Sequence, residues 1–170
     1  MTATERVFIG LGANLPGPHG GPRETLEAVL TALESDGIRI VARSRWYESA
    51  PVPPSDQPWY VNGVAEIATD REPAALLAVL HGVEAAFGRT RRVRNEARRI
   101  DLDLLAYGDR VAAGPDGPNL PHPRLQERAF VLLPLLEIAP DWRHPVLGST
   151  VRALCEGLPA DQSIRLLAPT

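Results

Sequence analysis

Two aspartates and a run of arginines form the part of this sequence most able to do chemistry. Asp101 and Asp103 are one residue apart, and six arginines lie just before them within the eleven residues 89–99. Arginine holds phosphate oxygens through forked hydrogen bonds, and carboxylates bind the Mg²⁺ that bridges such oxygens. The spacing therefore predicts a site for a metal-bound polyphosphate, with Arg89 and Arg98 best placed to point at the carboxylates.

The two aspartates begin an apolar segment, residues 100–107, that is typical of a β-strand. Because side chains alternate along a strand, Asp101 and Asp103 leave the same face and repel each other unless a cation lies between them. A pair of Mg²⁺ ions shared by the carboxylates would remove that repulsion. An exposed edge strand, or salt bridges to arginine, would explain the same pair without a metal.

The composition excludes several function classes. All 18 basic residues are arginine, which excludes the Walker A phosphate loop, the lysine of protein kinases and lysine Schiff-base chemistry. The net charge of -3 argues against a nucleic-acid-binding protein. Residues 10–14 resemble the start of a dinucleotide fingerprint, but its third glycine is missing, so a Rossmann fold is rejected.

The same composition indicates where the protein acts. Its single cysteine, Cys155, cannot form an internal disulfide, and the first residues lack the apolar core of a signal peptide. The longest apolar run, residues 129–136, is too short to span a bilayer. We therefore expect a cytoplasmic protein that binds neither nucleic acid nor membrane. We also expect a monomer that acts on small molecules.

Hydrophobic periodicity predicts a strand-helix-strand-strand-helix-strand order with further elements after it. Strands are expected over residues 7–11, 38–47, 59–68, 100–107 and 164–167. Helices are expected from Pro22 to the stop at Gly37 and from Pro73 to the stop at Gly88. A short or kinked helix over 128–138 and another over 151–158 follow. This order predicts one α+β domain over residues 1–170, a ferredoxin-like split βαβ sandwich with a mainly antiparallel central sheet flanked by helices.

Further residues could bind a ligand beside the aspartates. His122 lies between two prolines and close to Arg128, so it could donate to a phosphate. Glu84 could accept from a nucleotide hydroxyl or pair with an arginine. Tyr60 and Asn62 share a strand face, so a planar heterocycle could stack on the ring and hydrogen-bond to the amide. A lone histidine is more often structural than catalytic. On this pair alone, core packing of Tyr60 and a turn role of Asn62 are the favoured explanations.

Six segments carry a joint pattern that is highly specific. They are FIGLGANL (8–15), DQPWYVN (56–62), GR (88–89), RRIDLDLL (98–105), PHP (121–123) and RAFVLLPL (128–135). In this order the chain resembles the 6-hydroxymethyl-7,8-dihydropterin pyrophosphokinase family of folate biosynthesis. The likeness extends over residues 5–148.

The resemblance implies a ferredoxin-like domain that transfers pyrophosphate from ATP to the hydroxymethyl oxygen of the reduced pterin and leaves AMP. It implies that Asp101 and Asp103 bind two Mg²⁺ ions and act in catalysis with Arg89 and Arg98. The residues implied at the nucleotide are Glu84, Arg89, Arg98, His122 and Arg128. Those implied at the pterin are Ser49, Val52, Tyr60, Asn62 and Phe130, with the two aromatic rings on either side of the pterin.

The sequence departs from the family pattern in places. Residues 95–97 replace Trp-Gly-Pro, Ser49 replaces threonine, Pro123 replaces a frequent tyrosine, and His81 replaces a glutamine. No residue is an evident general base, and Asp103 is one possibility. A two-metal nucleotidyltransferase or phosphohydrolase could use the same aspartates on a ferredoxin-like sheet. A ligand-sensing domain without magnesium dependence is a further alternative.

Overall fold

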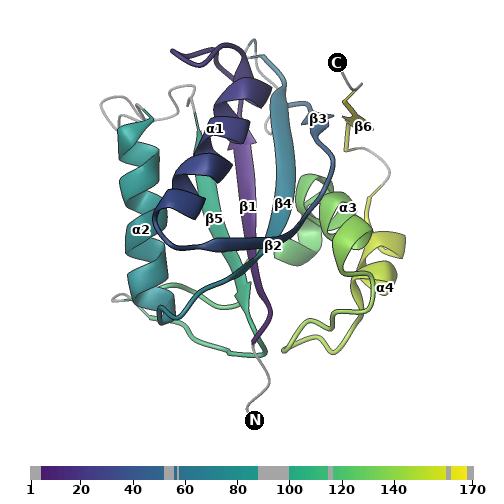
Figure 1. The fold of residues 1–170 in the computed structure, drawn as a ribbon. Coiled ribbons are helices and arrows are strands. Elements are labelled where there is room, and N and C mark those ends of the chain that lie inside the picture. Colours follow the sequence, from purple (N-terminus) through teal and green to yellow (C-terminus); the bar gives the residue numbers. More distant parts are fainter. Residues whose placement is uncertain are drawn as a thin grey trace.

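The computed structural model describes residues 5–51, 56, 58–87, 100–114, 117–159 and 162–167. Its helices and strands follow one another in the order seen in Figure 1. They are β1 (Val7–Ala13), α1 (Pro22–Ser35), β2 (Arg39–Arg43), β3 (Tyr47–Ser49), β4 (Tyr60–Ala68), α2 (Pro73–Ala86), β5 (Asp101–Tyr107), the 3-10 turn η1 (Leu125–Glu127), α3 (Ala129–Ile138), α4 (Val151–Glu156) and β6 (Ile164–Leu166).

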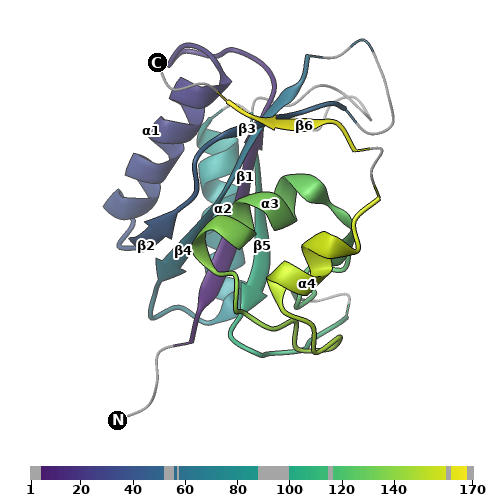
Figure 2. The same ribbon diagram turned by 90° about the vertical axis from the view of Figure 1, so that its right-hand side faces the viewer.

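The strands form one sheet in the order β5-β1-β4-β3-β6, and β2 pairs with β4 beyond the end of β3. Each of these pairings is antiparallel. Helices α1 and α2 cover one face of the sheet, and α3 and α4 cover the other (Figures 1 and 2). With β1 between β4 and β5, the arrangement confirms the predicted ferredoxin-like α+β sandwich.

Alternation along the strands divides the hydrophobic core into two layers. Ile9 and Leu11 of β1 belong to a cluster that packs under α1 and α2. Phe8 points the other way and packs with Leu132 of α3 and with Trp142. Because both faces are covered, β1 is buried along its whole length and reads in the sequence as a continuous apolar run.

The helices begin where the sequence predicts. Pro22 and Pro73 occupy the first positions of α1 and α2, where a missing backbone N–H costs nothing. The Glu24 side chain also accepts a hydrogen bond from the Gly21 N–H at 2.9 Å, which satisfies another free donor of α1. After α1 the chain turns at Gly37, whose φ of +84° suits glycine.

The strand predicted over residues 38–47 is two strands, β2 and β3, separated by Ser44, Arg45 and Trp46. The Ser44 hydroxyl accepts a hydrogen bond from the Val64 N–H at 3.0 Å. It thus takes the place of the backbone carbonyl that a regular strand would offer. The Trp46 ring fills the space beside Gly63, where a Cβ would come within 2.6 Å of it. These side-chain contacts interrupt the alternation, so the sequence pattern alone overestimates the length of the strand.

The helix predicted over residues 128–138 is α3, which begins at Ala129, just after η1. It is a short helix with Pro134 inside it. The segments predicted near 151–158 and 164–167 are α4 and β6. Within the described ranges, no helix combines the length and the apolar character needed to cross a bilayer.

Candidate functional site

Asp101 lies in one row of the sheet with Gly12 and Asn62. Gly12 of β1 pairs with Asp101 of β5 on one side and with Asn62 of β4 on the other. Directly opposed residues of antiparallel strands project from the same face, so both side chains stand on one face with a glycine between them. Two strand spacings separate the backbones of Asp101 and Asn62 by about 10 Å, and β1 carries no side chain between them at Gly12.

Asp103 lies in the next row, opposite Gly10, whose other partner is Val64. Val64 packs in the cluster that contains α3, so the aspartates stand on the face that α3 covers. Both carboxylates therefore flank backbone positions without side chains. A Cβ at Gly12 would lie 3.0 Å from Asn62 Nδ2, which is a tight contact. The sequence interpretation missed this role of Gly10 and Gly12, although their spacing of two within a strand places them on one face.

The donor set at this face fits magnesium. Asp101 and Asp103 are half-buried carboxylates on one strand face. In the part of the chain that the structure describes, no group of three or more acidic, histidine or cysteine side chains gathers at one point. Mg²⁺ is commonly held by one or two carboxylates, with water and substrate phosphates completing its shell. The two aspartates thus suit a metal that arrives with a polyphosphate.

Glu84 holds the strand that carries the aspartates. Its side chain is 2 % exposed, and Oε2 accepts from the backbone N–H of Leu102 at 2.8 Å. β5 is an edge strand, so alternate N–H groups point away from β1 and need another acceptor. Glu84 therefore fixes the residue between Asp101 and Asp103. Its predicted contact with the nucleotide stays a prediction.

His122 is presented to the same face by the segment after β5. Its backbone N–H donates to the Leu105 carbonyl, and its Nδ1 accepts from the Arg124 N–H at 3.2 Å. Burial lowers the pKa of His122, the Arg128 charge lowers it further, and the Asp101 carboxylate opposes this. A neutral imidazole whose Nδ1 accepts carries its proton on Nε2. His122 thus offers an uncharged N–H donor within electrostatic reach of Asp101 and Arg128.

The lowered pKa of His122 makes stability depend on pH. Below the ordinary value of 6.5 the unfolded chain takes up a proton at this residue more readily than the folded chain. The free energy of unfolding should therefore fall as the pH is lowered from about 7.5 to about 5.5. His122→Gln should make that fall less steep, as measured by urea unfolding at several pH values. Equal slopes for the two proteins would show that His122 does not contribute.

Three of the described residues predicted at the pterin lie on the same face. The Ser49 hydroxyl donates to Asn62 Oδ1 at 2.5 Å, and both side chains are buried. This bond fixes the amide of Asn62 with its Nδ2 over Gly12. Tyr60 lies two residues before Asn62 on β4 and so leaves the same face.

The start of α3 contributes the remaining described residues. Phe130 is half-buried, and the Arg128 guanidinium carbon lies 5.3 Å from the centre of its ring. A cation over an aromatic face is a favourable contact that restrains both side chains. α3 packs against β3 and β4, so Phe130 belongs to the side of the sheet that carries Tyr60. Stacking of a pterin between the two rings stays a prediction.

Three predicted site residues, Val52, Arg89 and Arg98, lie outside the described residues. The altered segment 95–97 also lies outside them. Their roles therefore rest on the sequence alone.

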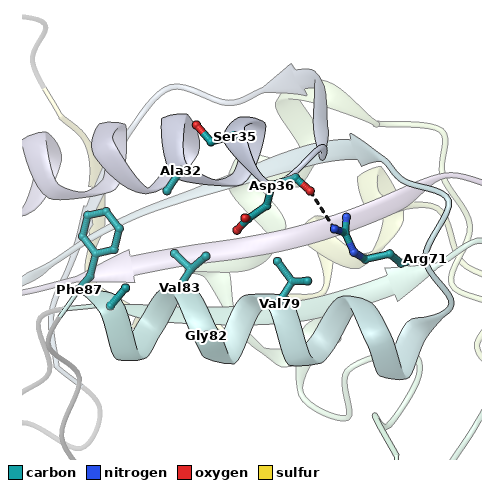
Figure 3. Close-up of a pocket in the computed structure, with 9 residues that line it drawn as sticks. Ala32, Ser35, Asp36, Arg71, Val79, Gly82, Val83 and Phe87 are labelled. Carbon is teal, nitrogen blue, oxygen red and sulfur yellow. Dashed lines mark hydrogen bonds between the residues drawn. The ribbon is translucent and has the colours of Figure 1, made fainter.

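A pocket of about 470 Å³ lies elsewhere, between α1 and α2. Figure 3 shows Phe87 at one end, and Asp36 and Arg71 at the other. The Arg71 guanidinium donates to the Asp36 carbonyl at 2.8 Å. This pocket lies on the face opposite the aspartates, and its lining contains none of the predicted site residues.

Comparisons with known proteins agree on one family. The fold is similar to the crystal structure of Plasmodium falciparum HPPK-DHPS with pteroate, with a TM-score of 0.70 at 14 % identity. That likeness covers 92 % of this chain and 43 % of the other, so this chain spans less than half of it. At this identity the likeness concerns the fold alone.

Closer relatives match in sequence. The chain is 44 % identical over 144 residues to the 2-amino-4-hydroxy-6-hydroxymethyldihydropteridine pyrophosphokinase of Pseudomonas aeruginosa, covering 83 % of this chain and 85 % of that protein. It is 36 % identical over 168 residues to a folic acid synthesis protein of Pneumocystis carinii, covering 97 % of this chain and 22 % of that longer protein. The family pattern itself matches residues 8–140. The chain therefore belongs to the 7,8-dihydro-6-hydroxymethylpterin-pyrophosphokinase family.

Proposed function

We propose that this site transfers pyrophosphate from ATP to the hydroxymethyl oxygen of 6-hydroxymethyl-7,8-dihydropterin, with AMP as the second product, in folate biosynthesis. The observation that carries the proposal is the row of Asp101, Gly12 and Asn62. This row supports a site in which the phosphates lie at Asp101 and the heterocycle lies at Asn62, on one face and close enough for a single transfer. The family membership favours this reaction over a two-metal nucleotidyltransferase or phosphohydrolase.

The pterin end orients the acceptor. Tyr60 and Phe130 enclose the pterin ring, and the backbone near Val52 contacts the edge of that ring. Because Ser49 occupies the Oδ1 atom of Asn62, the amide presents its Nδ2 donors toward the ligand. A fixed donor of this kind holds the hydroxymethyl group in one direction, toward the aspartates.

The phosphate end holds the ATP tail. His122 donates its Nε2–H to a phosphate oxygen without adding a charge, and Arg128 supplies a cation beside it. Arg89 and Arg98 contact the triphosphate from the preceding loop. Fixed donors and cations of this kind stabilise negative charge that shifts during the transfer.

Asp101 and Asp103 are the residues that would hold two Mg²⁺ ions. When bound, these ions supply neutralisation of charge on the triphosphate. The protein contributes the geometry: Glu84 fixes Leu102 between the two aspartates, and β1 carries a glycine opposite each aspartate.

In the transfer itself the hydroxyl oxygen attacks the β-phosphorus of ATP in line. The new oxygen–β-phosphorus bond forms as the bond between the β-phosphorus and the α–β bridging oxygen breaks, and that oxygen leaves with AMP. The hydroxyl proton must also leave, and Asp103 is the candidate acceptor on this face. The two aromatic rings and the helix above them exclude water that would compete for the phosphorus.

The remaining expectations are part of the same proposal. They are a single pyrophosphokinase domain over residues 1–170, a monomeric state, a cytoplasmic location and no nucleic-acid or membrane partner. Burial raises the pKa of the Cys155 thiol, which supports an unreactive cysteine.

The function is tested by incubation with ATP, Mg²⁺ and the reduced pterin, followed by mass analysis of the products. We expect AMP and a pterin carrying two additional phosphoryl groups, with both absent when either the pterin or Mg²⁺ is omitted. AMP released without pterin would support a phosphohydrolase. Pterin binding without turnover and without a magnesium effect would support a sensing domain.

Phe130→Ala should raise the Kd for the pterin about tenfold, because a stacked aromatic face is lost. Leu136→Ala is the matched control, since Leu136 lies on the same helix and packs against the same core cluster. Binding is measured by calorimetry with the reduced pterin and an ATP analogue. If both variants bind pterin equally well, Phe130 acts only in core packing.

A further inference from the structure

The segment 162–167 lies beside the site although it is beyond residues 8–140, which the family pattern matches. β6 pairs with β3, so that Ser49 lies opposite Ile164, and the Ala50 N–H donates to the Ser163 carbonyl at 3.0 Å. Figure 2 shows β6 beside β3, above the start of α3. The segment 162–167 therefore runs along the strand that carries Ser49.

Gln162 connects this segment to the opposite side of the site. Its Oε1 accepts from the Ala129 N–H at 2.8 Å, and its Nε2 donates to the Glu127 carbonyl at 2.8 Å. The two hydrogen bonds thus fix both neighbours of Arg128. The helix has no cap of its own, because the side chain of Arg128, its N-cap residue, makes no cap hydrogen bond. Gln162 supplies that cap from a distant part of the chain.

Two consecutive residues, Gln162 and Ser163, thereby contact two different sides of the proposed site. Gln162 holds the start of α3, and Ser163 holds Ala50, the neighbour of Ser49. A third contact lies on β6, where the Arg165 guanidinium carbon is 4.9 Å from the centre of the Trp59 ring, next to Tyr60. The segment 162–167 therefore touches the three stretches of chain that carry Ser49, Tyr60 and Phe130.

We propose that Gln162 is a positioning residue for pyrophosphate transfer. It fixes the positions of Arg128 and Phe130 relative to β3, the strand that carries Ser49. This inference rests on the proposed function. Gln162 does not touch substrate in this proposal. It acts through the backbone on either side of Arg128, so its loss allows the start of α3 to shift while both substrates are bound. A misplacement that persists at saturation lowers kcat and not only KM.

The test compares Gln162→Ala and the nearly isosteric Gln162→Met with Thr150→Ala. Thr150 is a matched control because its hydroxyl accepts from the Ala153 N–H at the start of α4, so its loss also removes one helix cap. Steady-state kinetics with varied ATP and varied pterin give kcat and both KM values. Thermal unfolding of the same samples gives Tm.

We expect both Gln162 variants to lower kcat about tenfold, while their Tm values stay close to the Tm of Thr150→Ala. Thr150→Ala should keep the wild-type kcat. A lowered Tm with a wild-type kcat in both Gln162 variants would make Gln162 a structural cap and overturn the inference, while the proposed function would stand. A wild-type protein that forms no AMP with pterin would overturn the proposed function, and the inference would fall with it.

Discussion

Asp101→Asn is expected to lower pyrophosphate transfer by about a thousandfold or more while the protein stays folded. Asparagine matches aspartate in shape, so the pairing of β5 with β1 should survive. In the proposed site, asparagine would lack the charge needed to hold Mg²⁺ and would leave the ATP tail without neutralisation opposite Gly12. The measurement is the rate of AMP formation at saturating ATP and pterin, together with Tm.

Asp109→Asn is the control, since Asp109 lies exposed in the turn after the same strand. It should keep the wild-type rate. Calorimetry with an ATP analogue should show that Mg²⁺ strengthens nucleotide binding to the control and not to Asp101→Asn. Near-normal turnover by Asp101→Asn would contradict the metal assignment.

Glu84→Ala is expected to destabilise the protein by about 1 to 3 kcal/mol, because it leaves the buried N–H of Leu102 without this acceptor. The loss should also reduce activity, since the residue that is released lies between Asp101 and Asp103. Urea unfolding gives the stability change, and the AMP assay gives the rate.

Glu84→Gln separates the hydrogen bond from the charge. The amide oxygen can still accept from Leu102, so this variant should recover most of the stability lost in Glu84→Ala. If Glu84→Gln is as unstable as Glu84→Ala, the negative charge rather than the bond to Leu102 stabilises the fold. If it is stable but inactive, the charge has a separate role at the nucleotide.

The fold follows closely from local patterns. Pro22 and Pro73 begin helices because each stands before an apolar stripe of helical period, and Gly37 ends the first of them. The order of elements then leaves few topologies, since strands joined by single helices and a short connection form the split βαβ sheet.

The error in the strand predicted over residues 38–47 arises where side chains replace backbone groups as hydrogen-bond partners. Ser44 accepts a ladder N–H through its hydroxyl, and Trp46 fills the space beside Gly63, so alternation continues in the sequence where the strand is interrupted. Periodicity reports which face is buried. It does not report which atom makes each hydrogen bond.

The site was harder to predict than the fold. Asp101 and Asp103 stand out because aspartates are rare in a strand interior, and the resemblance to a known family supplied most other candidates. Glu84 is a candidate for the nucleotide from the sequence, but its bond to the Leu102 backbone has no sequence signal. Gln162 was missed because its partners are more than thirty residues away and no local pattern records such a contact.

The most direct measurement is a crystal structure of the protein with a non-hydrolysable ATP analogue, Mg²⁺ and the reduced pterin. We expect the metal ions at Asp101 and Asp103, the triphosphate beside His122 and Arg128, and the pterin over the Asn62 end of the same row. Ligands bound instead between α1 and α2, or a pterin far from the aspartates on the other face of the sheet, would contradict the proposed site.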